Sequence, residues 1–171
     1  MKKQLVALSG LMLASSMAFA APAPGTWGLG ASHGSDHDST LYAPYMLSND
    51  MWVEPFLSFS WEKRHSGNEG KTYNYRLGVG LFKDIFQTPQ THAYAGGRLG
   101  YSRVEVKPDN GEDSTTDGVM VQPTLGFAYS PIDNIDVGAE AYLTWDHGHR
   151  NNDTDNLDTG TALFVRYYFG Q

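Results

Sequence analysis

The sequence has no cysteine among its 171 residues, and beyond its first twenty residues it has no long apolar run. The absence of cysteine excludes disulfides and leaves the start of the chain without a thiol for a lipoprotein anchor. Without an apolar stretch of ~20 residues, a membrane-spanning helix is excluded. Basic residues are also few, with 12 Lys and Arg against 19 Asp and Glu and a net charge of −7, which argues against a nucleic-acid partner.

The start of the chain has the features of a secretion signal. Lys2 and Lys3 form a charged beginning, a mostly apolar stretch follows, and the tripeptide Ala-Phe-Ala at 18–20 matches a small-x-small cleavage site. We therefore predict a signal peptide at residues 1–20 and a single exported domain at residues 21–171. Because cleavage removes two lysines, the net charge of that domain becomes −9.

Alternation of apolar and polar residues dominates the rest of the chain. Between Ile135 and Asp146 the odd positions are apolar, while most of the even positions are polar, charged or small. A period of two predicts β-strands with one apolar face. We expect eight strands, near residues 26–33, 40–47, 51–62, 71–82, 92–105, 118–130, 135–147 and 157–169. Six of them reach or exceed the ~9 to 11 residues that a tilted strand needs to cross an outer membrane.

The connectors between these strands fall into two alternating sets. One set lies at 48–50, 83–91 and 131–134, and the other, polar and mostly longer, lies at 34–39, 63–70, 106–117 and 148–156. Tight turns on one side and longer loops on the other are typical of outer-membrane barrels, although 83–91 is long for its side. The pattern predicts an all-β fold: an eight-stranded antiparallel up-and-down transmembrane β-barrel.

The alternation alone does not say which face meets lipid, because a soluble barrel with a ligand pocket would alternate too. Aromatic residues at the ends of the apolar face favour lipid contact at headgroup depth. The expected aromatic girdle comprises Trp27, Trp61, Tyr73, Tyr101, Tyr129, Trp145, Tyr167 and Phe169. The expected charged residues of the lumen are Glu54, Arg76, Arg98, Glu140 and Arg166. Both signs occur inside, so we expect structural pairing of these charges.

Four motifs add a family resemblance: Trp52-Val53-Glu54-Pro55 opening a strand, the segment 94–101, the turn 130–134, and the aromatic last strand 164–169. In this order and spacing the chain resembles the outer-membrane protein β-barrel domain family, the small eight-stranded barrels of Gram-negative bacteria. The resemblance implies a place in the outer membrane, contact with its lipid and lipopolysaccharide, and recognition of the terminal aromatic by the barrel-insertion machinery. Gly170 and Gln171 follow Phe169 here, which departs from the usual ending.

Catalysis by a lipid A deacylase would need a serine, a histidine and a carboxylate on the outer wall. The only His-x-Ser is His33-Gly34-Ser35, with Asp36 and Asp38 in the same loop. The pattern expected on later strands is absent, so we predict no enzyme, no catalytic residue and no cofactor.

Histidines are gathered at one end of the predicted barrel. His33, His37, His65, His147 and His149 fall at external strand ends or loops, and His92 lies on the other side. Imidazoles beside carboxylates could bind zinc or copper or titrate with pH. The spacing matches no regular metal motif, so we favour solvated loop histidines and predict no metal site.

Eight strands leave an interior that side chains just fill, so no solute pore is expected. We predict a monomeric, non-enzymatic outer-membrane barrel that serves envelope integrity or surface interaction through acidic external loops at 109–117 and 151–158. Three alternatives stay open: a narrow or gated channel, a lipid-modifying enzyme, and a soluble periplasmic ligand-binding barrel.

Overall fold

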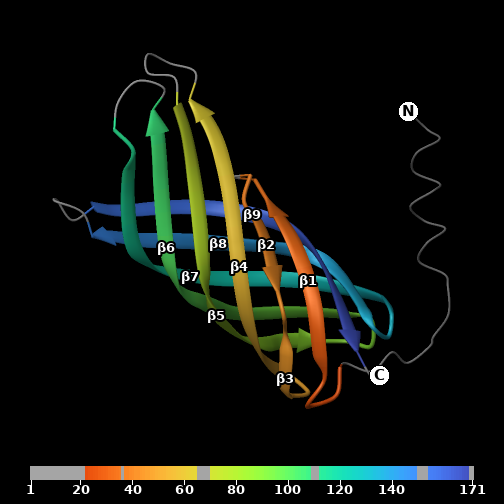
Figure 1. Ribbon diagram of the computed structural model, residues 1–171. Coiled ribbons are helices and arrows are strands. Elements are labelled where there is room, and N and C mark those ends of the chain that lie inside the picture. Colours follow the sequence, from red (N-terminus) through yellow and green to blue (C-terminus); the bar gives the residue numbers. More distant parts are fainter. Residues whose placement is uncertain (1–21, 36, 65–69, 109–111, 150–153, 170–171) are drawn as a thin grey trace, which may run out of the picture.

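The structure, a computed structural model, describes residues 22–35, 37–64, 70–108, 112–149 and 154–169. Antiparallel strands wrap around a single axis in these residues (Figure 1). The described residues contain no helix that is long and apolar enough to span a membrane.

Nine strand segments build the sheet. They are β1 (Trp27–Gly34), β2 (Ser39–Tyr42), β3 (Tyr45–Ser48), β4 (Met51–Arg64), β5 (Gly70–Gln87), β6 (Thr91–Pro108), β7 (Ser114–Ile132), β8 (Ile135–His149) and β9 (Thr154–Phe169). Segments β2 and β3 are two parts of one strand position, since both pair with β1 on one side and with β4 on the other. Ala43 and Pro44 interrupt that strand, because proline has no N–H for a ladder hydrogen bond.

Pairing of the first and last strands closes the barrel. Eight residue pairs join β1 to β9, from Trp27 opposite Phe169 to Gly34 opposite Ala162. The sheet therefore has no edge along this seam. β1 begins and β9 ends on the same side of the barrel. The predicted eight-stranded antiparallel up-and-down barrel is confirmed.

Several strands are longer than the sequence predicts. The connector expected at 83–91 is wrong, because β5 continues to Gln87 and only Thr88–Gln90 separate it from β6. A register shift between Asp84 and Phe86 breaks the alternation there and hides the strand from a period-two search. At the opposite end, β6 extends to Pro108 and β7 begins at Ser114. The predicted connector at 106–117 is therefore also too long.

The turns are tight on the side where β1 begins and β9 ends. The turn between β3 and β4 contains only Asn49 and Asp50. The Ser48 hydroxyl donates to Asp50 at 2.7 Å, and this hydrogen bond together with nearby Lys83 lowers the pKa of Asp50.

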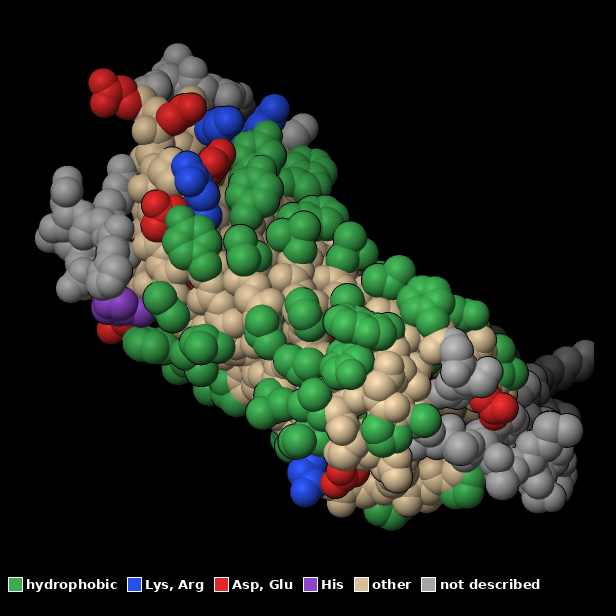
Figure 2. All heavy atoms as spheres, turned by 60° about the horizontal axis from the view of Figure 1, so that its bottom comes forward, with side chains coloured by type: hydrophobic (Ala, Val, Ile, Leu, Met, Phe, Trp, Pro, Cys, Tyr) green, Lys and Arg blue, Asp and Glu red, His purple; other side chains and the backbone are tan. Residues whose placement is uncertain are grey.

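Side chains sort cleanly between the two faces of the sheet. Large apolar residues such as Leu57, Leu77 and Leu125 are at least half exposed on the outer wall. Buried residues inside the barrel include both aromatic and charged side chains, among them Trp52, Tyr94 and Arg166. Figure 2 shows apolar side chains spread over the wall of the molecule, with charged ones gathered toward its ends.

The β1–β2 hairpin is shorter than its neighbours. Its pairing ends at Gly34 against β9 and at Ser39 against β4, while β9 begins at Thr154 and β4 runs to Arg64. The rim of the barrel is therefore lower at this hairpin than along β4 to β7 (Figure 1).

Candidate functional site

Four charged side chains meet in the middle of the lumen. Arg98 donates from Nη1 to Glu140 at 2.9 Å and from Nη2 to Glu54 at 2.8 Å. Arg166 donates from Nη2 to Glu140 at 3.1 Å and lies 3.2 Å from the second oxygen of Glu54. All four residues are 5% exposed or less. Two positive and two negative charges thus balance one another in a space that excludes water, which is the arrangement that buried charges need.

Aromatic rings surround this cluster. The Tyr94 hydroxyl donates to Glu140 at 2.7 Å. The guanidinium carbon of Arg166 lies 4.3 Å from the ring centre of Phe164 and 5.1 Å from that of Tyr94, and Trp52 packs edge-on against Tyr94. Cation–π contacts of this kind are strongest where water is excluded. The rings and the ion pairs together fill the cross-section of the barrel.

Arg76, the remaining charge expected in the lumen, lies apart from the central cluster. It pairs with Asp38 of the β1–β2 turn and, at 3.2 Å, with Asp146 of β8. These three side chains are 12 to 18% exposed. Arg76 therefore links the short β1–β2 hairpin to the taller strands at the outer rim.

A histidine stands at the opposite end of the lumen. His92 Nδ1 lies 2.7 Å from Asp84, and its Nε2 lies 3.3 Å from Asp136. Ser130 donates its hydroxyl to the other oxygen of Asp136 at 2.6 Å. The imidazole bridges the ends of β5 and β8 through β6, and both of its nitrogens are used in doing so.

Little free space remains inside. One cavity lies on the Arg76 side of the central cluster and another on the His92 side, and each has a volume of about 20 Å³. A volume of this size holds roughly one water molecule. The described part of the lumen is a packed core rather than an aqueous channel.

The residues expected in the aromatic girdle lie on the outer wall near both ends of the strands. Trp61, Tyr73, Tyr101 and Trp145 are at the end of the long hairpins, and Trp27, Tyr129, Tyr167 and Phe169 are at the end of the tight turns. Seven of the eight are 37 to 59% exposed, and Tyr73 is half-buried. Two members contact one another, since the ring centres of Tyr167 and Phe169 are 5.1 Å apart.

The residues considered for catalysis point to different partners. His33 Nδ1 lies 3.1 Å from the Ser39 hydroxyl, whereas the Ser35 hydroxyl accepts a hydrogen bond from the backbone of Thr161 at 3.2 Å. His33 therefore contacts Ser39 and not Ser35, the serine of the deacylase hypothesis. Asp36, the carboxylate between them in the deacylase hypothesis, lies outside the described residues.

Two further histidines, His37 and His147, lie in different segments of the chain. His37 is in the β1–β2 turn with a positive φ of 66°, and His147 Nδ1 lies 2.7 Å from Asp155. His65 lies outside the described residues. In the described ranges, no group of three or more His, Cys, Asp or Glu side chains is arranged to hold a metal ion.

The acidic external loops are only partly described. Residues 109–111 and 151–153 lie outside the described ranges, and Ser114–Asp117 and Thr154–Asp158 belong to β7 and β9 rather than to loops. Basic side chains accompany the acidic ones at this end: Arg103 pairs with Glu105 at 3.2 Å, and Lys107 lies over the ring of Tyr73. The outer ends of the strands therefore carry both signs of charge.

Solved structures show the same architecture. Neisserial surface protein A aligns with a TM-score of 0.61 at 19% identity, over 84% of this chain and 95% of its own. The N-terminal β-barrel domain of OprF from Pseudomonas aeruginosa aligns with a TM-score of 0.58 at 17% identity, over 86% and 100%. The chain has the fold of the small eight-stranded outer-membrane barrels. Ail, the attachment invasion locus protein of Yersinia pestis, shares this barrel with a TM-score of 0.50 at 13% identity, over 84% and 93%.

At these identities the shared property is the fold. No family model matches the chain. No curated protein matches it either. The comparisons therefore give the fold of the chain, and its function has to be inferred from its own residues.

Sequence reasoning missed several residues of the lumen network. Tyr94 has the same parity as Arg98 on β6, so the alternation that placed Arg98 inside also places Tyr94 there. Asp146, one partner of Arg76, has the inward parity of Glu140 on β8, whereas the other partner, Asp38, left no such signal because it lies in a turn, where alternation does not apply. The contact of His92 with Asp84 crosses the register shift near Phe86.

Proposed function

We propose that the protein is a non-enzymatic barrel of the outer membrane, exported by the signal at residues 1–20, that supports the envelope or meets surface partners through the outer ends of its strands and loops. The observation that carries the proposal is the contrast between the two faces of the sheet. The wall exposes a continuous apolar surface edged by aromatic rings, and the interior holds a closed ion-pair cluster. Apolar outside and polar inside is the arrangement that lipid demands.

The packed lumen supports a structural role over transport. Arg98, Arg166, Glu54 and Glu140 are held by ion pairs and rings, and cavities of about 20 Å³ on either side are too small for hydrated ions or solutes. The hydrogen bonds of Ser35 and His33 run to Thr161 and Ser39, which supports a non-enzymatic barrel over a lipid-modifying one. Lipopolysaccharide and lipid are the partners that such a wall contacts in the membrane. The functional unit is a monomer.

The absence of cysteine allows a direct test of this placement, because any introduced thiol is the only one in the protein. Thr115→Cys lies at the outer end of β7, and Thr88→Cys lies in the β5–β6 turn at the opposite end. A membrane-impermeant maleimide added to intact Gram-negative cells should label the first variant and should reach the second only after the cells are broken. Equal labelling of both in intact cells, or release of the protein in the soluble periplasmic fraction, would contradict the proposal.

A further inference from the structure

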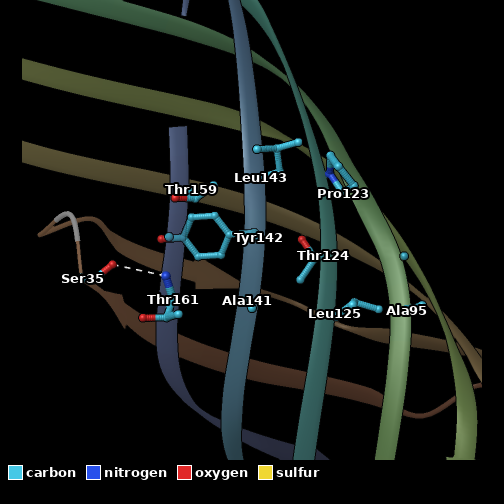
Figure 3. A pocket seen from close by; sticks show the side chains of 12 residues that line it. Ser35, Ala95, Pro123, Thr124, Leu125, Ala141, Tyr142, Leu143, Thr159 and Thr161 are labelled. Carbon is cyan, nitrogen blue, oxygen red and sulfur yellow. Dashed lines mark hydrogen bonds between the residues drawn. The ribbon is translucent and has the colours of Figure 1, made fainter. Parts of the chain in front are cut away.

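The outer wall has a groove that runs across β6 to β9. Its volume is about 670 Å³, and its lining is mostly apolar. Ala95, Pro123, Leu125, Ala141 and Leu143 contribute outward side chains along its length (Figure 3). Ser35, Thr159 and Thr161 line it at the seam of β9 and β1.

Small outward side chains create this groove. Ala95 lies opposite Leu125, Leu125 opposite Ala141, and Ala141 opposite Thr161, so an alanine or threonine occupies three of the four strands in this row. On β5 the outward series has larger members, Leu77 and Val79. The wall is therefore hollowed across β6 to β9.

The groove lies between the two rows of aromatic side chains. On β8, Ala141 and Leu143 follow Val137 and precede Trp145, and on β9 Thr159 and Thr161 precede Tyr167. This part of the wall faces hydrocarbon in a membrane-inserted barrel. An empty groove in such a wall is unfavourable, because its lining loses dispersion contacts. The neighbouring lipid surface is continuous with the groove, so an acyl chain is its natural occupant.

One backbone acceptor in the groove lacks its usual donor. Pairing of β7 with β8 holds one register at Val121 opposite Trp145 and at Thr124 opposite Tyr142, but it is interrupted between them at Pro123. Pro123 has no N–H, and in this register the carbonyl opposite it belongs to Leu143. An acceptor without a donor is costly in hydrocarbon. A ligand that brings a hydroxyl into the groove would remove this cost.

Hydroxyl groups mark the same end of the groove. Thr159 is the cross-strand neighbour of Leu143 on β9. The backbone of Ser35 donates to the Thr161 carbonyl at 2.8 Å. The Thr161 backbone donates to the Ser35 hydroxyl at 3.2 Å (Figure 3). The groove thus has a long apolar floor and a short polar stretch. This lining is complementary to an acyl chain that carries one oxygen substituent.

We propose that this groove binds one acyl chain of an outer-leaflet lipid, and that the bound chain carries a hydroxyl group that donates to the carbonyl of Leu143. The inference rests on membrane insertion of the barrel, as proposed above, and adds a lipid-binding site to it. A plain acyl chain and a second copy of the protein are the other occupants that the wall could accept, and the experiment separates them.

The probe is a pair of fatty acids that differ by one oxygen. The folded protein in detergent micelles is mixed with equal amounts of tetradecanoic and 3-hydroxytetradecanoic acid and examined by native mass spectrometry. We expect one bound acid per protein, with the hydroxylated form favoured about fivefold, the ratio that one neutral hydrogen bond provides. Equal binding of the two acids would overturn the role of the Leu143 carbonyl.

Variants locate the bound acid. Ala141→Phe fills the groove and should abolish both adducts, whereas Ala31→Phe, an outward alanine on β1 away from the groove, should keep them. Pro123→Val and Pro123→Ala each restore an N–H. Both variants should keep the adduct but bind the two acids about equally. Unchanged adducts in Ala141→Phe, or a dimer without adducts, would overturn the site.

Folding controls keep the two proposals separate. Each variant is first checked for a mobility shift between unheated and boiled samples in SDS. A wild-type protein that lacks this shift would contradict the membrane barrel itself. A heat-shifting barrel that binds neither acid would contradict only the groove.

Discussion

Arg98 donates to Glu140 at 2.9 Å inside the lumen, and the two side chains come from β6 and β8, which lie two strands apart in the sheet. Both residues are almost fully buried, and Glu54 and Arg166 complete the cluster. A bond of this kind joins two strands of the wall that are not paired in the sheet.

Replacing Arg98 with alanine should destabilise the barrel strongly. The change leaves two carboxylates with Arg166 as their only cation in the cluster, and loss of one member of a buried ion pair costs about 3–5 kcal/mol. Urea unfolding in lipid vesicles, followed by tryptophan fluorescence, measures the loss. Arg103→Ala is the matched control on the same strand: its side chain is 45% exposed, so the expected change is below about 1 kcal/mol. Similar losses in the two variants would contradict the cluster's structural role.

Adding one methyl group at Gly126 should also destabilise the fold. A Cβ at this position would lie 2.1 Å from the Tyr94 ring, and that ring is held in place by the hydrogen bond of its hydroxyl to Glu140. Overpacking of this kind costs about 1–3 kcal/mol. At Gly97, on the outer face, the nearest atom to an added Cβ is the Gln122 carbonyl oxygen at 3.3 Å, so Gly97→Ala should destabilise the barrel less than Gly126→Ala. A tolerated Gly126→Ala would mean that Tyr94 is free to move.

Arg76→Ala should loosen the outer rim without opening the barrel. Arg76 holds Asp38 of the β1–β2 turn against Asp146 of β8, so its loss removes the link between the short hairpin and the tall strands. Hydrogen exchange should become about tenfold faster in residues 37–42 and stay unchanged in β6 and β7, because local opening follows local contacts. Lys83→Ala is the control, since its pair with Asp50 is exposed. Uniform acceleration through all strands would show that Arg76 supports the whole barrel instead.

The wild-type protein should form no steady ion channel in planar bilayers. The lumen cavities hold about 20 Å³ each, and the central cluster separates them. Arg98→Ala should add no conductance, because Trp52, Phe82 and Tyr94 still fill the centre. Large, stable single-channel currents from the wild type would contradict the packed lumen and favour a channel.

Alternation alone predicted most of the fold, because a lipid-facing wall imposes a period of two on every strand. The same parity placed Glu54, Arg98, Glu140 and Arg166 inside. It could not predict which charges would meet, since that depends on the stagger of the strands around the barrel. Arg76 opposes Ser58 and Ser102 near the rim, and so it pairs with Asp38 and Asp146 rather than with the central carboxylates.

Strand ends were the weakest part of the prediction for a related reason. Beyond the hydrocarbon layer a strand no longer needs an apolar face, so Ser114–Asp117 form part of β7 without alternating. Near Phe86 the register shift reverses the parity and makes the end of β5 resemble a loop. The groove at Pro123 was not predictable from alternation, because its hollow depends on how residues from four neighbouring strands align.

The most direct test of the membrane barrel is its electrophoretic mobility in SDS after extraction from outer membranes in mild detergent. A barrel closed by eight β1–β9 pairs should resist SDS until it is heated, so unheated and boiled samples should run at different positions. We predict this heat-dependent shift for protein in the outer-membrane fraction. The same mobility before and after boiling, with the protein recovered in the soluble periplasmic fraction, would contradict the account.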